Sequence, residues 1–242
     1  MNPLEMGGSA TFTVPRKRLN GMDLAQLLHA AQDLRFLLGR GYPQLASLTL
    51  VGNRYNLTYD ARQLLHRGVF DPVLAARRRS KLCLVRDLTG QPLALDGHNA
   101  LITVECGLSG LPLIAADDGF IRDIGQISHR YKPSAITDRA LILISRFLAD
   151  GDIGPVMVWY DAPMSRSGEL AKHTRQILQE YGLLGEVEAV LQPENKLMAF
   201  QGVIGTSDTQ LIDQATAVVD VAGEIIRRLP RVNLITLGGN GS

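Results

Sequence analysis

Residues 91–101 read Gln-Pro-Leu-Ala-Leu-Asp-Gly-His-Asn-Ala-Leu, and this stretch decides the fold class. An apolar run at 93–95 ends in Asp96, and a pattern with helical spacing follows at once. A short buried strand that leads into a helix is typical of a parallel sheet with crossover helices. Similar runs predict strands at 93–95, 111–116, 156–160, 187–191, 203–205 and 232–237. Helical patterns between them predict helices at 100–108, 137–148, 167–181, 209–217 and 221–229.

The chain before residue 91 has a different pattern. Apolar residues recur at helical spacing from Leu24 to Leu38, and three shorter helical segments follow at 43–51, 58–66 and 71–81. Thr58 and Asp71 stand where N-caps are expected, and Pro72 suits a first helical turn. We therefore predict a small all-helical domain at 1–90. An α/β domain, mainly a parallel sheet with flanking helices, is predicted at 91–242.

The two regions differ in charge. Residues 1–90 carry 13 Lys/Arg and 6 Asp/Glu, a net of +7, whereas residues 91–242 carry 12 and 18, a net of −6. A basic region favours approach to polyanions and an acidic one attracts cations. Solvated faces that merely differ in charge are the simpler alternative.

Several classes of protein are disfavoured by the sequence. The longest apolar stretch, 100–116, is interrupted by polar residues, glycines and a proline, and is too short to span a bilayer. Residues 1–10 lack the apolar core of a secretory signal, so a cytoplasmic protein without membrane contact is predicted. The motifs Gly-x-Gly-x-x-Gly, Gly-x-Ser-x-Gly and the P-loop are absent, which argues against dinucleotide-binding proteins, serine hydrolases and P-loop enzymes.

Aspartates follow four of the predicted strands: Asp96, the pair Asp117 and Asp118, Asp161, and Asp208. The carboxyl ends of parallel strands lie along one edge of a sheet, where such folds bind their ligands. Crowded carboxylates repel one another unless a cation neutralises them. A hard cation with oxygen ligands, Mg²⁺ or Mn²⁺, is therefore predicted at this edge.

Each aspartate alone also has a structural explanation. Asp96-Gly97 fits a turn, Asp208 fits the cap of a helix that begins at Thr209, and Asp117-Asp118 fits a solvated loop. Capping, however, does not require an acidic residue at the end of strand after strand, so the repetition favours the metal site.

Short motifs resemble those of PIN-like and NYN-type ribonuclease domains. Residues 95–101 resemble their opening strand and turn, whose usual form is an apolar strand followed by Asp-Gly-Tyr-Asn; His98 departs from the Tyr. Tyr160-Asp161-Ala162-Pro163 and Thr206-Ser207-Asp208-Thr209 resemble two later turns of the same domains. This likeness covers residues 91–220. The whole chain also resembles an uncharacterised prokaryotic family with a short basic helical domain before such a region.

The nuclease resemblance implies a metal-dependent hydrolase of phosphodiester bonds, with RNA as the expected substrate. It implies that Asp96, Asp161 and Asp208 are metal ligands and that Asn99 orients Asp96 or the substrate. Further ligand candidates without a firm motif position are Glu105, Asp118, Asp123 and Asp213. Water activated by the metal would be the nucleophile, and no nucleophilic side chain is needed.

Basic side chains in two places are candidates for contacts with backbone phosphates. They are Arg166, Lys172 and Arg175 after Asp161, and Arg77, Arg78 and Arg79 in the helical region. Solvated helix faces are the alternative for both groups. A different class of function also stays open: a regulatory protein that binds nucleic acid or a nucleotide without cleaving it. A homodimer is compatible with either function.

Overall fold

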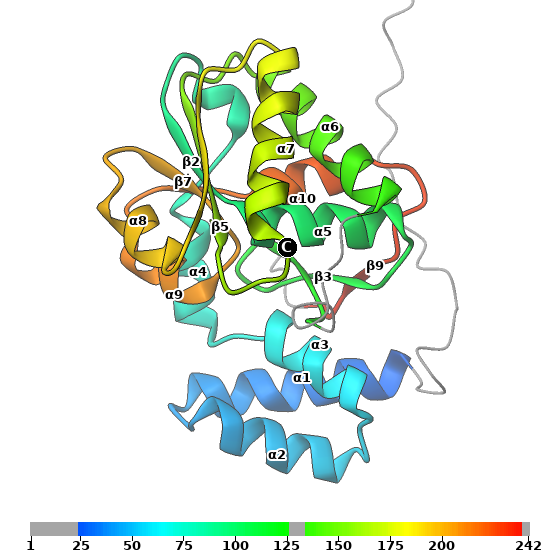
Figure 1. Ribbon diagram of the computed structural model, residues 1–242. Coiled ribbons are helices and arrows are strands. Elements are labelled where there is room, and N and C mark those ends of the chain that lie inside the picture. Colours follow the sequence, from blue (N-terminus) through cyan, green and yellow to red (C-terminus); the bar gives the residue numbers. More distant parts are fainter. Residues whose placement is uncertain (1–23, 126–133, 239–242) are drawn as a thin grey trace, which may run out of the picture.

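The computed structural model describes residues 24–125 and 134–238, so the prediction about residues 1–10 lies outside the described residues. These residues form an α/β region preceded by helices (Figure 1). The N-terminal helices are α1 (Leu24–Gly39), α2 (Gln44–Arg54), α3 (Tyr59–Gly68) and α4 (Pro72–Arg79). None of the described helices is long and apolar enough to cross a membrane.

Side-chain caps start α3 and α4 where the sequence predicts them. The Thr58 hydroxyl accepts a hydrogen bond from the Ala61 backbone N–H, and Asp71 accepts one from Leu74. Pro72 occupies the first turn of α4, where no backbone N–H is needed. Local chemistry is therefore sufficient to place these helix starts.

Within the described residues the main sheet has six strands, all parallel, in the order β1-β8-β7-β2-β5-β6. From β2 the chain moves outward to β5 and β6, and then returns to β7 on the other side of β2. The strand order therefore reverses between the paired strands β2 and β7. Open parallel sheets bind ligands at the carboxyl ends of the strands at such a switch point. The strands are β1 (Leu82–Cys83), β2 (Leu93–Asp96), β5 (Val156–Asp161), β6 (Gly185–Val190), β7 (Val203–Gly205) and β8 (Val218–Val219).

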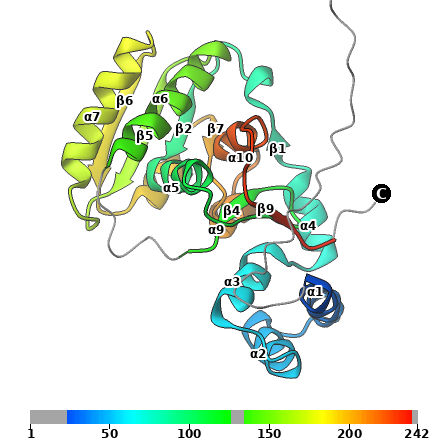
Figure 2. The same cartoon turned by 90° about the vertical axis from the view of Figure 1, so that its right-hand side faces the viewer.

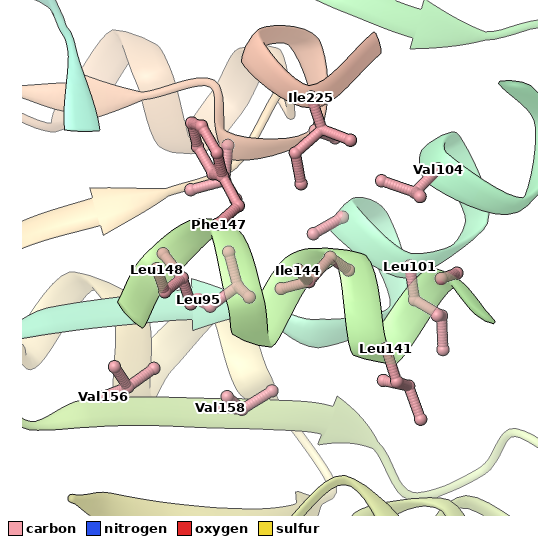
Figure 3. Packing of buried hydrophobic residues seen from close by; sticks show 14 of the residues in the cluster. Leu95, Leu101, Val104, Leu141, Ile144, Phe147, Leu148, Val156, Val158 and Ile225 are labelled. Atoms are coloured by element: carbon pink, nitrogen blue, oxygen red, sulfur yellow. The ribbon is translucent and has the colours of Figure 1, made fainter. Parts of the chain in front are cut away.

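Both faces of this sheet are covered by helices, and alternate residues of β2 enter different cores. Leu93 and Leu95 contact the larger core, whereas Ala94 contacts a smaller one. Figure 3 shows Leu95 of β2 facing the helical side chains of the larger core. The helices on that face are α5 (Gly97–Leu108), α6 (Ala135–Asp150), α7 (Ser167–Glu180) and α10 (Val221–Ile226); those on the other are α8 (Pro193–Ala199) and α9 (Thr209–Gln214).

The predicted strand 111–116 does not join the main sheet. It forms β3 (Leu113–Ala115), which pairs antiparallel with β4 (Ile121–Asp123) and parallel with β9 (Leu234–Thr236). The expectation that all the aspartate-bearing strands share one sheet edge is therefore wrong for this strand. Asp117-Asp118 lies in the β3–β4 turn, where Gly119 adopts a φ of 89°.

The helical region packs on this small sheet. Leu27 and Leu34 of α1 and Leu64 of α3 share a core with Ile114 of β3 and Ile235 of β9. Figure 2 shows α1, α2 and α3 gathered below β4 and β9. This core of α1, α3, β3 and β9 residues joins the two ends of the described chain, because α1 begins it and β9 lies near its C-terminal end.

Candidate functional site

The stretch Asp96-Gly97 joins β2 to α5 without a loop. The Asp96 carboxylate caps α5: Oδ1 accepts from the Asn99 backbone N–H at 3.3 Å, and Oδ2 accepts from the Thr206 hydroxyl at 3.0 Å. A Cβ atom at Gly97 would lie 2.6 Å from Cε1 of Tyr160, so glycine is required for this close approach. The turn and cap considered for Asp96 are real, and Thr206 ties this carboxylate to β7.

His98 connects α5 to the end of β5. Its Nδ1 accepts a hydrogen bond of 3.0 Å from the Asp161 backbone N–H, and its ring meets the edge of Tyr160 with centroids 4.9 Å apart. Burial lowers the pKa of His98 to about 4, which keeps the ring neutral and Nδ1 able to accept. Histidine at the place of the expected tyrosine thus holds the backbone that carries Asp161.

Asn99 holds the turn Thr206-Ser207-Asp208. Its side-chain Oδ1 accepts from both the backbone N–H of Ser207, at 2.9 Å, and the Ser207 hydroxyl, at 3.0 Å. The Asp208 backbone N–H donates to the Thr206 hydroxyl at 3.1 Å, and Asp208 Oδ1 caps α9. The side chain of Asn99 therefore orients this turn, and only its backbone N–H touches Asp96.

The strand register places three predicted ligands on one side of the sheet. Asp96 pairs with Trp159, and Asp161 lies two residues further along the same strand. Leu95 pairs with Gly205, so Thr206 lies beside Asp96 and Asp208 is two residues further on. Because side chains alternate along strands, this parity directs Asp96 and Asp161 to the face covered by α8 and α9, whereas Asp208 lies beyond β7 at the start of α9.

A fourth carboxylate, Glu194, joins these three and was not predicted. It is exposed in the first turn of α8, which follows β6. No element is predicted from the sequence at 192–202. Pro193 was the available signal, because proline after a strand marks the first turn of a helix. The position of α8 brings Glu194 near both Asp96 and Asp161.

Two of these carboxyl groups, those of Asp96 and Asp161, have raised pKa values. Burial raises the pKa of half-buried Asp96 to about 7, and the negative charges of Asp208 and Glu194 add to this effect. Desolvation, and secondly the charge of Glu194, raise the pKa of Asp161. Bonds from Asn99 and Thr206 oppose the shift of Asp96 but do not cancel it.

Among the described residues, the carboxylates of this edge have no paired cation. Across residues 24–125 and 134–238, no Lys, Arg or His forms a salt bridge with Asp96, Asp161, Glu194 or Asp208. In the same residues, no three His, Cys, Asp or Glu side chains are arranged to hold a metal ion together. The carboxylates are therefore brought together in interacting pairs, without a preformed cage.

Asp118 belongs to another cluster, and its predicted place at the edge of the main sheet is corrected. Its side chain is fully buried and receives two hydrogen bonds of 2.8 Å from Arg122. Arg78 approaches it at 3.4 Å and also pairs with Asp213 at 2.7 Å. These arginines supply the positive charge that a metal would otherwise bring.

Glu105 and Asp123 also lie away from Asp96. Glu105 is buried in the third turn of α5, about 12 Å along the helix axis from its first residue. Its charge acts on Cys106 and Tyr160, whose pKa values are raised mainly by burial. Asp123 approaches Arg67 at 3.9 Å. The structure does not bring Glu105 or Asp123 to the strand ends.

The predicted phosphate-binding residues divide into buried and exposed ones. Arg78 is buried in the ion-pair cluster, so its assignment to a phosphate is corrected. Arg77 and Arg79 are exposed, and Arg79 donates to the Asp117 carbonyl.

The basic residues after Asp161 are exposed at the start and along one side of α7. Arg166 precedes the helix, with a left-handed φ of 61°, and pairs with Glu169 at 2.5 Å. Lys172 is exposed one turn into the helix, and Arg175 reaches the Val187 carbonyl of β6. Arg166 therefore lies in the connection between β5 and α7, and the side chain of Arg175 is bound to β6.

Comparisons with known proteins place the chain in a family. The domain of unknown function DUF5616 matches residues 85–224, and the protein of unknown function DUF434 matches residues 26–81. Uncharacterized protein MJ0935 of Methanocaldococcus jannaschii is 30% identical over 204 residues, which cover 84% of this chain and 97% of that protein. Since the first match spans more than half of the chain and the relative is covered almost completely, the chain belongs to the DUF5616 family.

Proposed function

We propose that this protein is a cytoplasmic, metal-dependent nuclease that hydrolyses phosphodiester bonds in RNA. One observation carries the proposal: four carboxylates lie in interacting pairs at the switch point of a parallel sheet, and no cation among the described residues is paired with them. Carboxylates whose pKa values are raised in this way are typical of functional sites. The resemblance of the Asp96 and Asp208 turns to ribonuclease motifs supports RNA as the substrate.

The donor set fits a hard divalent cation. We assign Asp96 and Asp208 as the pair of direct ligands, and Asp161 and Glu194 as carboxylates that would act through bound water. Mg²⁺ keeps several waters and often takes only one or two protein carboxylates, so a three-carboxylate cage is not required. When bound, Mg²⁺ or Mn²⁺ would lower the pKa of a water and offset charge on the scissile phosphate.

The chain's own residues orient the site and receive the substrate. Thr206 holds Asp96 Oδ2, Asn99 holds the Ser207 turn, and His98 holds the backbone of Asp161. We assign the exposed Arg166 and Lys172, at the start and in the second turn of α7, as candidate contacts for backbone phosphates. With a pKa of about 7, the Asp96 carboxyl is partly protonated at neutral pH until a cation arrives.

The rival function is a non-catalytic regulatory protein that binds nucleic acid or a nucleotide at the same edge. It is favoured by the observation that no three candidate ligands are arranged for a metal among the described residues. Such a protein would use the strand ends for recognition and would leave the bound phosphodiester intact.

Asp208→Asn, with Asp71→Asn as the matched control, tests the proposal. Both aspartates cap a helix through Oδ1, but Asp71 caps α4 in the helical region. Asparagine is a good N-cap, so both variants should melt within a few degrees of the wild type. We expect Mn²⁺ to raise the melting temperature of the wild type and of Asp71→Asn, and to raise that of Asp208→Asn much less.

Cleavage of a labelled single-stranded RNA, with the same sequence in DNA beside it, separates the two functions. Asp208→Asn should lose at least about 100-fold in rate, because the metal supplies both the nucleophile and charge stabilisation. Stabilisation of the wild type by Mn²⁺ without cleavage would favour the regulatory protein. A wild type whose melting temperature does not rise with Mn²⁺ and which does not cleave RNA would contradict the proposed nuclease function.

A further inference from the structure

Arg122 connects the buried ion-pair cluster to the candidate site. It lies on β4 with 3% of its surface exposed, and both of its terminal nitrogens bind Asp118 at 2.8 Å. Its remaining nitrogen, Nε, donates to the backbone carbonyl of Ser207 at 2.7 Å. All three donor positions of the guanidinium are therefore used within the fold, and the one at Nε reaches the turn that carries Asp208.

Ser207 is held from two directions. Asn99 accepts from its backbone N–H and its hydroxyl, and Arg122 donates to its carbonyl. Thr206 and Asp208 lie on either side of this residue, and Thr206 in turn donates to Asp96. A displaced Ser207 carbonyl would move the neighbours that orient Asp96 and present Asp208.

Arg122 is itself fixed by packing. Its guanidinium lies 5.2 Å from the centre of the Phe70 ring and 5.5 Å from that of Phe120. Arg78 from α4 lies over the same Phe70 ring at 4.7 Å, and it joins Asp118 to Asp213 on α9. The rigid cluster therefore ties the helical region, the β3–β4 hairpin and α9 to one carbonyl of the site.

We propose that Arg122 is a positioning residue for the carboxylate site, because its Nε–H fixes the Ser207 carbonyl and with it the turn bearing Thr206 and Asp208. This role deepens the proposed function and rests on it for its effect on metal binding. The structural part, the anchoring of the turn, does not depend on any metal. The two parts are therefore measured separately.

Arg122→Lys is the test variant and Arg35→Lys is its matched control. Arg35 pairs with the neighbouring Asp117 through two bonds of 2.7 and 2.8 Å and donates to a backbone carbonyl, that of Leu237, at 2.9 Å. Both substitutions keep the charge beside an aspartate of the same turn and remove the planar fork of donors. Only Arg122 has its carbonyl partner in the site.

The first measurement is amide hydrogen exchange without metal. In Arg122→Lys the backbone amides of Ser207 and Asp208 should exchange about 10-fold faster than in Arg35→Lys at equal global stability, which corresponds to the loss of one ordinary hydrogen bond. Equal exchange in the two variants would overturn the proposal. Should Arg122→Lys fail to fold, the wild-type Arg122 Nε proton provides the test. A resonance protected from exchange supports the bond to Ser207, and an unprotected one refutes it.

The second measurement is the dissociation constant for Mn²⁺. We expect it to rise at least about 10-fold in Arg122→Lys and to stay at the wild-type value in Arg35→Lys, as for residues that orient metal ligands. Equal affinity in both variants would overturn the role in metal binding. If the wild type binds no Mn²⁺, the proposed function fails, while the exchange experiment still decides whether Arg122 anchors the turn.

Discussion

The β3–β4 turn and the carboxyl edge of the main sheet both carry several aspartate or glutamate side chains. They differ in burial and in whether these carboxylates are paired with arginines. In the turn, Asp117 and Asp118 are buried, and each forms a two-bond ion pair with an arginine. At the edge, Asp208 and Glu194 are exposed, and no described cation is paired with them. Buried, neutralised carboxylates hold elements together. Accessible carboxylates that repel one another lower stability, and raised carboxyl pKa values are typical of functional sites.

The largest effect is expected from neutralising the paired region. Asp118→Asn would leave Arg122 and Arg78 without their shared buried counter-charge, and loss of one partner of a buried pair costs about 3–5 kcal/mol in free energy of unfolding. The same change at the edge, Asp161→Asn, should alter stability by less than about 0.5 kcal/mol. Urea denaturation of both variants measures the difference. Similar costs for the two would erase the distinction between the regions.

A smaller effect should appear in the pH dependence of stability. The Asp96 carboxyl has a pKa of about 7 in the folded protein, against 3.8 as its ordinary value. Between these values the folded state holds a proton that the unfolded state has lost. The free energy of unfolding should therefore fall by roughly 2–4 kcal/mol as the pH rises from about 4 to 7, and then level off.

Asp96→Asn should remove the part of that decline that Asp96 contributes, because asparagine does not ionise, while Asp161 and Asp220, whose pKa values are also raised, still contribute. Urea unfolding at intervals between pH 4 and 8, on the wild type and on Asp96→Asn, provides the measurement. Addition of Mn²⁺ at pH 8 should restore stability to the wild type and not to the variant. Parallel pH profiles for the two proteins would show that the Asp96 carboxyl does not have a raised pKa.

The smallest effect concerns the exposed arginines beside the paired region. Arg77→Ala combined with Arg79→Ala should leave the free energy of unfolding within about 0.5 kcal/mol of the wild type. The slope of log affinity for single-stranded RNA against log salt should fall by about 0.7 for each lost phosphate contact. Filter-binding titrations at several salt concentrations test this. An unchanged slope would make both residues a solvated helix end.

Local sequence patterns were sufficient for much of the fold. The caps at Thr58 and Asp71, the helix α1 and the strands β2, β5 and β7 follow from short-range chemistry and periodicity, and the structure contains them. The α/β class, with a helical region in front of a parallel sheet, follows from the same patterns. Elements were missed where the pattern is too short to be periodic, as in the two-residue strands β1 and β8.

In the candidate site too, some features follow from local sequence and others depend on tertiary contacts. The sequence determined that Asp96 and Asp161 end strands and that Asp208 follows one, because an apolar run followed by a polar turn is a local signal. It did not determine which sheet a strand enters, so Asp118 was expected beside them and lies with Arg122 instead. Strand partners, the burial of Arg78 and the approach of Glu194 to Asp96 depend on contacts between residues far apart in the chain. Long-range packing, which no single stretch encodes, therefore decided which carboxylates are paired with arginines and which have no paired cation among the described residues.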